Sequence, residues 1–384
     1  MSRDLGNARK NKNDEFYTVY EYIQKEVNAY LEYFPDTFKD KIVFLPCDDP
    51  EWSNFTRFFA QNFENLGLKK LISTSFSTES KKHNGYQFSL EDFLTDYEKT
   101  SPQFDENITA TRGKIFVLER DTNGSGNIDI KDLKWSYLEG DGDFRSDEVK
   151  ALRDEADIIV TNPPFSLFRE FVAWIMEADK KCLIIGSQNA ITYKEIFPLI
   201  KDNKFWVGAT CNSEDMVFRV PDGATINPKD KEKAEKLGFV GNYTRLGNAN
   251  WFTNIEHGRR HQPLSLMTES DNLKFSKHKD LIEVGYQTYD NFDAIEVSHL
   301  DSIPSDYEGI MGVPITFLSK YCPEQFEILG FGAGELGTQA GVRPYDKRLK
   351  PLSSALRDGI PYIYDRESNT VKVPYARIFI RKRV

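Results

Sequence analysis

An α/β fold with a mostly parallel, doubly wound sheet is predicted by three observations on this chain of 384 residues. Short strand-like runs alternate with helical stretches over its first two thirds, which is the pattern of βαβ units. The run at residues 156–161 is short and mostly apolar and β-branched, with no polar alternation, as expected of a strand covered on both faces. An Asn-Pro-Pro-Phe turn at residues 162–165 directly follows this run, at the strand end where open α/β sheets bind ligands.

The order of elements follows from apolar periodicity and from the residues that begin or end helices. We expect strands at residues 41–47, 70–76, 114–119, 133–138, 156–161, 182–187, 205–210 and 216–220. We expect helices at residues 53–65, from 145 to about 155, at 167–177 and at 193–200, with a polar insertion over 77–112. From about residue 256 the pattern loosens into short strands with Gly, Pro and basic residues. One domain is therefore expected over residues 1–255 and a smaller one over 256–384.

Composition indicates a soluble globular protein. Hydrophobic residues make up 39% and charged residues 29% of the chain, and no apolar run approaches the ~18 residues that would span a membrane. The amino terminus lacks an apolar signal region, so a cytoplasmic location is expected. The four cysteines lack CxxC spacing, which argues against a disulfide framework and a zinc site. No metal site is expected. The cysteines are Cys47, Cys182, Cys211 and Cys322.

Charge is unevenly distributed along the chain. The net charge of −10 argues against a generic nucleic-acid binder, for which a basic domain is expected. Basic residues nevertheless gather in the last third, where a local basic surface would suffice to grip DNA. Each of these clusters of basic residues, taken alone, is more often a solvent-exposed surface than a DNA-binding site. The candidate DNA-binding residues are Arg259, Arg260, Arg343, Lys347 and Arg348.

The turn at residues 162–165 suits methyl transfer to an exocyclic amine. Two consecutive prolines, Pro163 and Pro164, end the preceding strand because neither can donate a backbone hydrogen bond. The side-chain oxygen of Asn162 and the carbonyl of Pro163 can each accept one N–H, which localises the lone pair of the amine. Phe165 can stack on the ring that carries the amine. A proline-rich loop without chemistry is the plainer alternative.

Four segments taken together resemble the adenine-specific DNA methyltransferases of the EcoRI-type family. Residues 13–18 resemble the segment that contacts the methionine end of the cofactor, and residues 46–50 occupy the place of the cofactor turn. Residues 142–144 resemble the segment whose acidic residue bonds the adenine of the cofactor beside a packing aromatic ring. The resemblance implies that the cofactor-binding residues are Phe16, Tyr17, Thr18, Pro46, Cys47, Asp48, Asp49, Asp143 and Phe144.

This resemblance implies a Rossmann-like methyltransferase sheet followed by a carboxyl-terminal DNA-recognition region. The implied activity is transfer of a methyl group from S-adenosylmethionine to N6 of an adenine flipped out of double-stranded DNA. Asn162, Pro163, Pro164 and Phe165 would be the catalytic residues. A monomer is expected, and whether a companion restriction endonuclease exists is left open.

The cofactor turn departs from the usual pattern. Such a turn is ordinarily rich in glycine because the backbone must approach the cofactor closely. Residues 46–50 instead read Pro-Cys-Asp-Asp-Pro, as in the EcoRI-type family. Which of Asp48 and Asp49 faces the cofactor is open.

Two other segments imitate ligand-binding motifs. Residues 327–334 are glycine-rich after a strand, but only 50 residues follow, too few for the rest of a cofactor domain. We expect a structural or DNA-facing loop there. Residues 121–132 match the ligand positions of an EF-hand loop. The preceding run reads as a strand, so a turn between two strands is the favoured interpretation.

Two alternative functions remain from sequence. A methyltransferase with the same turn could act on RNA adenine or on a protein glutamine amide. A chain of another class would be a non-catalytic DNA-binding protein on a methyltransferase scaffold, although the intact Asn-Pro-Pro-Phe turn argues against it.

Overall fold

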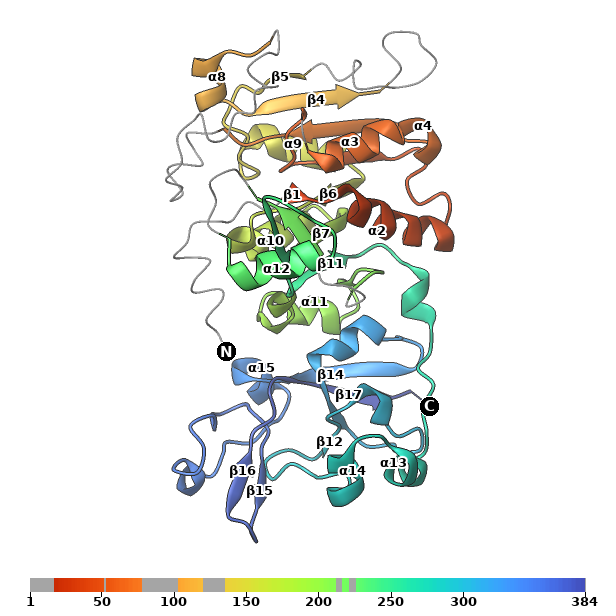
Figure 1. Ribbon diagram of the computed structural model, residues 1–384, viewed down its shortest axis with the longest axis vertical. Coiled ribbons are helices and arrows are strands. Elements are labelled where there is room, and N and C mark those ends of the chain that lie inside the picture. Colours follow the sequence, from red (N-terminus) through yellow and green to blue (C-terminus); the bar gives the residue numbers. More distant parts are fainter. Residues whose placement is uncertain are drawn as a thin grey trace. The chain divides into compact units, whose positions relative to one another are not determined.

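The computed structural model describes residues 17–51, 53–77, 103–119, 135–211, 216–220 and 226–383 (Figure 1). Phe16 and the EF-hand-like residues 121–132 lie outside these ranges. The chain forms two compact units. Unit 1 comprises Met1–Gln188 with Val207–Glu256, and unit 2 comprises Asn189–Trp206 with His257–Val384. This division does not test which unit recognises DNA, so the assignment of DNA recognition to residues 256–384 stays a prediction.

A large mixed sheet with the strand order β5-β4-β3-β2-β6-β7-β11-β8 forms the centre of unit 1. Its central strands β3, β2, β6 and β7 run parallel. Strands β4, β5 and β11 pair in antiparallel fashion at the two sides. The strands are β2 (Ile42–Leu45), β3 (Lys70–Thr74), β4 (Lys114–Leu118), β5 (Trp135–Tyr137), β6 (Ile158–Thr161), β7 (Lys181–Ser187), β8 (Trp206–Val207) and β11 (Ala249–Thr253).

The predicted α/β class is confirmed, and the large sheet is mixed, with parallel strands at its centre. An antiparallel pair, β4 and β5, extends one side of these central strands, and β11 lies antiparallel beside β7 on the other. Strand β11 was not predicted, although all five of its residues are buried.

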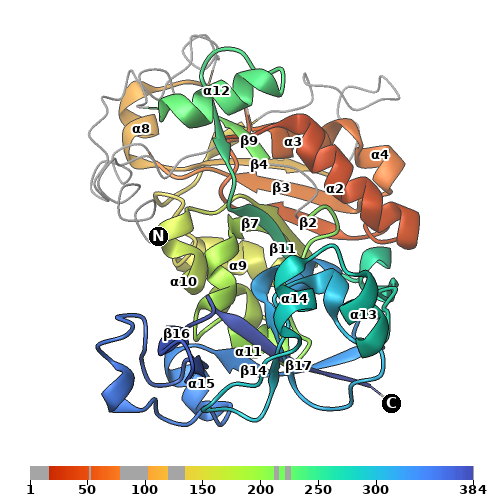
Figure 2. The same ribbon diagram turned by 60° about the horizontal axis from the view of Figure 1, so that its bottom comes forward.

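Helices pack on both faces of this sheet, as Figure 2 shows. On one face, alternate strand residues such as Val43 and Leu45 join α2 and α3 in one hydrophobic core. On the other face α9 contacts β2, and Phe168 of α10 packs against Phe252 of β11. The helices of unit 1 are α2 (Tyr20–Tyr33), α3 (Asn54–Gln61), α4 (Phe63–Leu66), α8 (Glu106–Thr111), α9 (Asp147–Glu155), α10 (Phe168–Glu177) and α12 (Pro228–Lys236).

Capping residues account for several helix boundaries. Ser53 accepts a hydrogen bond from the backbone N–H of Phe55 and begins α3, and Ser146 does the same for Val149 in α9. The helix expected over residues 53–65 breaks at Asn62 into α3 and α4. Gly67, with a φ of 62°, ends α4 in the left-handed conformation that favours glycine.

A small antiparallel sheet with the order β1-β9-β10 completes unit 1. Strand β1 pairs with β9 so that Tyr17 lies opposite Arg219 and Thr18 opposite Phe218. The pairing fixes the described end of the amino-terminal cofactor segment. The strands are β1 (Tyr17–Thr18), β9 (Met216–Arg219) and β10 (Tyr243–Leu246).

Unit 2 is built on a four-stranded sheet of order β12-β13-β17-β14, with a separate β15-β16 pair. Its strands are β12 (Ile295–Glu296), β13 (Met311–Pro314), β14 (Phe326–Gly332), β15 (Ile363–Asp365), β16 (Thr370–Lys372) and β17 (Arg377–Lys382). Its α-helices are α11 (Phe197–Lys201), α13 (Glu269–Phe275), α14 (Lys279–Val284) and α15 (Gly334–Gln339). Its short 3-10 segments include η4 (Gly258–His261), η5 (Leu300–Ser302), η6 (Ile315–Lys320) and η7 (Lys347–Leu349).

Two predicted elements are shorter than expected. The helix expected over residues 193–200 is reduced to α11, which has Pro198 in its first turn, where the missing N–H is tolerated. The strand expected over residues 205–210 is the two-residue β8. Across the described ranges, no helix combines the length and the apolar character needed to cross a membrane.

Candidate catalytic and cofactor turns

The two turns singled out by sequence lie side by side at one edge of the large sheet. In the order β3-β2-β6-β7, the strand that follows β2 along the chain lies on one side of it, and the strand that follows β6 lies on the opposite side. The topological switch point of the sheet is therefore between β2 and β6. Residues 46–50 follow β2 and residues 162–165 follow β6, two parallel neighbours. Open α/β sheets bind ligands outside the carboxyl ends of the strands at such a switch point.

The turn at residues 46–50 is fastened to the end of β3. The backbone N–H of Asp48 donates to the carbonyl of Thr74 at 3.0 Å, and the Ser73 hydroxyl donates to the carbonyl of Asp48 at 2.6 Å. The Thr74 hydroxyl donates to the carbonyl of Pro46 at 3.3 Å. Hydrogen bonds from side chains therefore hold a turn that has no glycine.

The carboxylate of Asp48 joins the two turns. It accepts one hydrogen bond from Ser53 at 2.7 Å and one from the hydroxyl of Thr161 at 2.6 Å. Thr161 is the last residue of β6 and directly precedes Asn162. Burial raises the pKa of Asp48 to about 7, against the opposing effect of these two hydroxyl donors. Asp48 therefore fixes the start of the Asn-Pro-Pro-Phe turn from the neighbouring turn.

Asp49 has a different partner. Its carboxylate lies 3.1 Å from the ammonium group of Lys114, which also contacts Glu51 at 2.8 Å. Lys114 begins β4, is 3% exposed, and lies 4.9 Å from the ring centre of Trp135. A buried cation shared by two carboxylates thus fixes the second half of the turn to the sheet. Nothing in residue spacing pointed to Lys114.

Thr18 lies beside the same turn. Asn54, the first residue of α3, donates its side-chain N–H to the carbonyl of Thr18 at 2.8 Å. The hydroxyl of Thr18 is buried and has no hydrogen-bond partner within the described part of the chain. A buried hydroxyl without a partner is costly, so a ligand that bonded it would remove that cost. Its neighbour Tyr17 belongs to the same strand, β1.

The segment with Asp143 and Phe144 packs close to the end of β3. The backbone N–H of Ser77 donates to the carbonyl of Asp141 at 2.7 Å. Gly142 has a φ of 83°, and a Cβ there would lie 2.2 Å from the carbonyl oxygen of Ser75, so glycine is required. The third predicted segment therefore adjoins the strand whose end holds the turn at residues 46–50.

Asp143 and Phe144 are each engaged within the protein. Arg145 contacts both carboxylate oxygens of Asp143, with its Nη2 atom at 2.6 Å. Burial would raise the pKa of Asp143, but the hydrogen bonds and charge of Arg145 hold it below its usual value. Phe144 is buried against two aromatic rings of α10, those of Phe171 and Trp174. The aromatic ring thus packs on the helix that follows the catalytic turn.

The predicted catalytic turn, residues 162–165, is shaped by its prolines and by packing. Pro163 is buried, whereas Asn162, Pro164 and Phe165 are partly exposed. The backbone N–H of Leu167 donates to the carbonyl of Pro164 at 3.0 Å and opens the 3-10 segment η2 (Phe165–Leu167). The ring of Phe165 packs against the hydrophobic core of unit 1. The turn thereby places an amide and an aromatic ring at the carboxyl end of β6.

Sequence reasoning missed Asn250 in this neighbourhood. Asn250 lies on β11 opposite Gly186 of β7, and Ile184, two residues earlier on β7, pairs with Thr161. It is 5% exposed, and its side-chain nitrogen has no hydrogen-bond partner across the described ranges. The buried run of β11 was the available signal, because a polar side chain in a fully buried strand calls for a partner.

The predicted DNA-binding residues all lie in unit 2. Arg343, Lys347 and Arg348 are exposed, and Arg348 pairs with Asp346 at 2.7 Å. Arg259 is partly exposed, whereas Arg260 is only 4% exposed. The guanidinium of Arg260 lies 3.6 Å from the ring centre of Trp206. That burial accounts for Arg260 structurally, and DNA contacts by these five residues stay a prediction.

The glycine-rich run at residues 327–334 has a packing explanation. A Cβ at Gly330 would lie 2.5 Å from the Cβ of Ala340, and one at Gly332 would lie 2.8 Å from the ring of Phe379. These glycines let α15 and β17 approach β14 closely. The structural interpretation of this loop is therefore favoured over a cofactor turn.

Comparisons with known proteins agree on one family. The family described as "Adenine-specific methyltransferase EcoRI" matches residues 4–383. The type II methyltransferase M.EcoRI of Escherichia coli is 40% identical over 331 residues, which cover 86% of this chain and 89% of that protein. M.MpnI of Mycoplasma pneumoniae is 36% identical over 84% of this chain and 83% of its own length. A type II methyltransferase of Mycoplasma genitalium is 35% identical over 84% of each protein. No solved structure shows a significant match.

Proposed function

The chain belongs to the EcoRI family of adenine-specific DNA methyltransferases, and from this premise we propose how it works and which residues carry the reaction. The reaction is transfer of a methyl group from S-adenosylmethionine to N6 of an adenine in double-stranded DNA. One observation supports the proposal above the others: the hydrogen bond from Thr161 to Asp48, 2.6 Å long, joins the two turns at the switch point of the sheet.

The large sheet fits a doubly wound, Rossmann-like methyltransferase sheet. Four parallel central strands have helices on both faces, and the two candidate turns follow the strands on either side of the switch point. The antiparallel strands β4 and β11 flank these central strands. This arrangement favours a site shared by the turns at residues 46–50 and 162–165.

The residues near the first turn fit S-adenosylmethionine, which supplies an electrophilic methyl group. The buried hydroxyl of Thr18, which has no hydrogen-bond partner among the residues that the structure describes, offers a hydrogen bond beside Tyr17 and the 46–50 turn. The Asp143 carboxylate, held ionised by Arg145, is suited to accept an amino N–H. Both carboxylates of this turn are committed within the protein, Asp48 to Ser53 and Thr161 and Asp49 to Lys114, so they shape the turn against which the cofactor would lie.

The second turn binds and orients the target amine. The side-chain oxygen of Asn162 and the carbonyl of Pro163 accept its two N–H groups, so the lone pair is localised toward the methyl carbon. The ring of Phe165, only partly buried, stacks on the adenine. These residues would hold N6 in line with the methyl group that S-adenosylmethionine supplies, and the proton lost from the amine would pass to water. Positioning and desolvation supply most of the rate enhancement, because no strong base is required.

The target adenine has to leave the duplex, because its amino group is engaged in base pairing. We assign DNA binding to residues 256–384. In this proposal the exposed residues Arg343, Lys347 and Arg348 contact phosphates. The type II relatives imply a companion restriction endonuclease. A monomeric enzyme suffices for this scheme.

Transfer of labelled methyl groups from S-adenosylmethionine tests the proposed substrate. Unmethylated duplex DNA, total RNA and unmethylated protein are offered separately, and the products are digested and separated. We expect label in N6-methyladenine from duplex DNA alone. Label in RNA adenine or in methylglutamine would point to one of the alternative substrates, and absence of cofactor binding would revive the non-catalytic alternative.

A further inference from the structure

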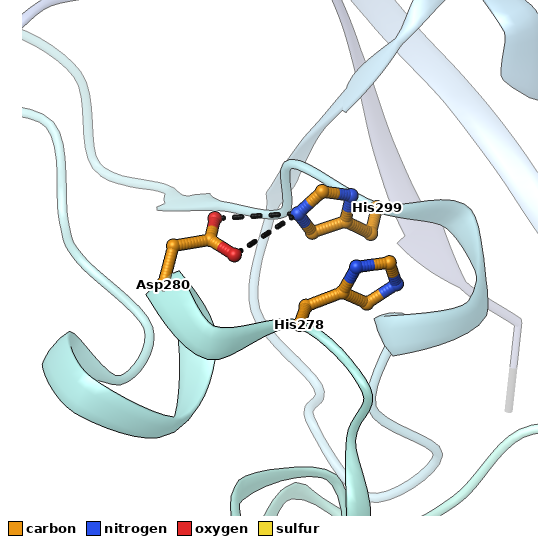
Figure 3. A group of neighbouring side chains, drawn as sticks. All are labelled: His278, Asp280 and His299. Atoms are coloured by element: carbon orange, nitrogen blue, oxygen red, sulfur yellow. Dashed lines mark hydrogen bonds and ion pairs between the residues drawn. The ribbon is translucent and has the colours of Figure 1, made fainter.

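Three side chains of unit 2 converge at the amino end of α14. His278 is the N-cap residue of that helix, Asp280 lies in its first turn, and His299 directly precedes η5. Each offers one ligand atom, and these atoms lie within 4.8 Å of one another. The two imidazole rings are parallel, with centres 3.6 Å apart. Figure 3 shows the carboxylate of Asp280 directed at the same side of both rings.

The histidines are oriented by carboxylates. His299 faces Asp280 through its Nε2 atom, at 3.2 and 3.3 Å from the two oxygens. His278 faces Asp301 through its own Nε2 atom at 2.8 Å, and Lys277 holds the other oxygen of Asp301 at 2.9 Å. A proton on Nε2 of His278 leaves the lone pair on Nδ1, the ring nitrogen that Figure 3 shows on the side of Asp280.

We propose that His278, Asp280 and His299 bind one divalent transition-metal ion, with Zn²⁺ as the best-suited ion. Two imidazoles and one carboxylate match the nitrogen and oxygen ligands of zinc, and a water completes four-coordination. Mg²⁺ and Ca²⁺ prefer oxygen ligands alone. Asp301 takes the place of the outer carboxylate that commonly orients a metal-binding histidine.

Binding requires a small local change. The lone pairs of imidazole lie in the ring planes, so the parallel rings tilt toward each other to share one ion. The ion then replaces the hydrogen bond between Asp280 and His299. The three ligands come from the start of α14 and from the segment between β12 and η5, so the ion clamps these two parts of unit 2 together. Neither the site nor its test depends on the proposed methyl transfer.

Cysteine spacing predicts no metal site in this chain, but the three proposed ligands are histidines and an aspartate. Asp280 and His299 are 19 residues apart, and the carboxylate that orients His278 is 23 residues from it. These spacings match no short zinc motif. The convergence exists only in the folded chain.

Calorimetry on the untagged full-length protein, freed of metal by a chelator, tests the proposal with ZnCl₂ as the probe. We expect about one ion per chain, a higher melting temperature with zinc, and visible absorption bands when Co²⁺ replaces it. His278→Ala and His299→Ala should each abolish this binding. Asp301→Asn should weaken it by roughly 10- to 100-fold, as expected for loss of an outer carboxylate.

His261→Ala is the matched control. His261 pairs with Glu324 at 2.8 Å and is not part of the triad of proposed ligands, His278, Asp280 and His299. Its loss should therefore leave zinc binding unchanged. Asp280→Asn keeps the size of the side chain and guards against variants that merely misfold, as does the melting temperature of each variant without metal. No stoichiometric binding at about 100 µM zinc, or equal binding by wild type and all folded triad variants, would overturn the proposal.

Discussion

The turns after β2 and β6 are neighbours, but they are held in different ways. The turn at residues 46–50 depends on polar side chains: Asp48 bonds two hydroxyls, and Asp49 pairs with a buried lysine. The turn at residues 162–165 depends on two prolines and on aromatic packing. A polar network can be loosened by a single substitution or a change of pH, whereas proline geometry is fixed covalently. The more easily disturbed turn, at residues 46–50, therefore holds the more rigid turn, at residues 162–165, through the hydrogen bond between Asp48 and Thr161.

Lys114→Ala should produce the largest effect on the first turn. The ammonium group lies between Asp49 and Glu51, with a side chain 4% exposed. Its removal leaves two buried carboxylates uncompensated, which costs about 3–5 kcal/mol of unfolding free energy. Lys70→Ala is the control, because Lys70 also contacts two carboxylates but at a more exposed site. Denaturant unfolding that gave equal losses for both variants would contradict this difference.

Asp48→Asn should alter how stability depends on pH. Burial raises the pKa of Asp48 to about 7, so the folded state favours the protonated carboxyl. This contribution is complete below the unfolded pKa of about 3.9 and is lost as the pH rises through about 7. The asparagine variant should therefore gain melting temperature relative to wild type between about pH 4 and 7. A constant difference over that range would show that Asp48 does not titrate there.

Gly186→Ala tests the packing behind the second turn. A Cβ at Gly186 would lie 2.3 Å from the ring of Phe168, so the ring and α10 have to shift. Overpacking of this kind costs about 1–3 kcal/mol. We expect a lower unfolding free energy and slower methyl transfer, because α10 begins just after the catalytic turn. A second substitution, Phe168→Leu, should recover part of the loss. Full stability of the single variant would show that this packing is looser than described.

Thr161→Val should have the smallest effect on stability and the most selective effect on activity. The substitution removes the hydroxyl that joins the two turns but keeps the shape of the side chain. We expect a loss of about 1 kcal/mol and a fall in kcat of about tenfold, with the KM for S-adenosylmethionine nearly unchanged. Thr161→Ser, which keeps the hydroxyl, should retain most of kcat. An equal fall in both variants would remove the hydrogen bond as the cause.

Local signals were enough to locate the turn at residues 162–165. A short apolar run followed by two prolines predicted a buried strand and its end, and β6 confirms this. The class of fold followed from the same kind of signal. Strands β4 and β5 match the runs predicted at residues 114–119 and 133–138, whereas β11 was missed, because its place in the sheet depends on pairing with the distant β7.

The interior of the site could not be read from sequence. Asp48 and Thr161 are 113 residues apart, and Lys114 and Asp49 are 65 apart. The sequence predicted Asp48 and Asp49 as a pair, but the direction of each carboxylate depends on which hydroxyl or amine the fold brings near it. The surroundings of Asn250 and of the triad at α14 likewise depend on which distant residues the fold brings together. Residue type indicated the chemistry, and tertiary contacts determined the role.

The central claim is that Asn162 orients the target amine at a site shared with the cofactor turn, and Asn162→Ala tests it most directly. Methyl transfer to duplex DNA and binding of S-adenosylmethionine are measured on the same preparation, with Asn189→Ala of unit 2 as a control asparagine substitution. We predict loss of transfer with cofactor affinity retained. Near-normal turnover by the Asn162 variant would contradict the account.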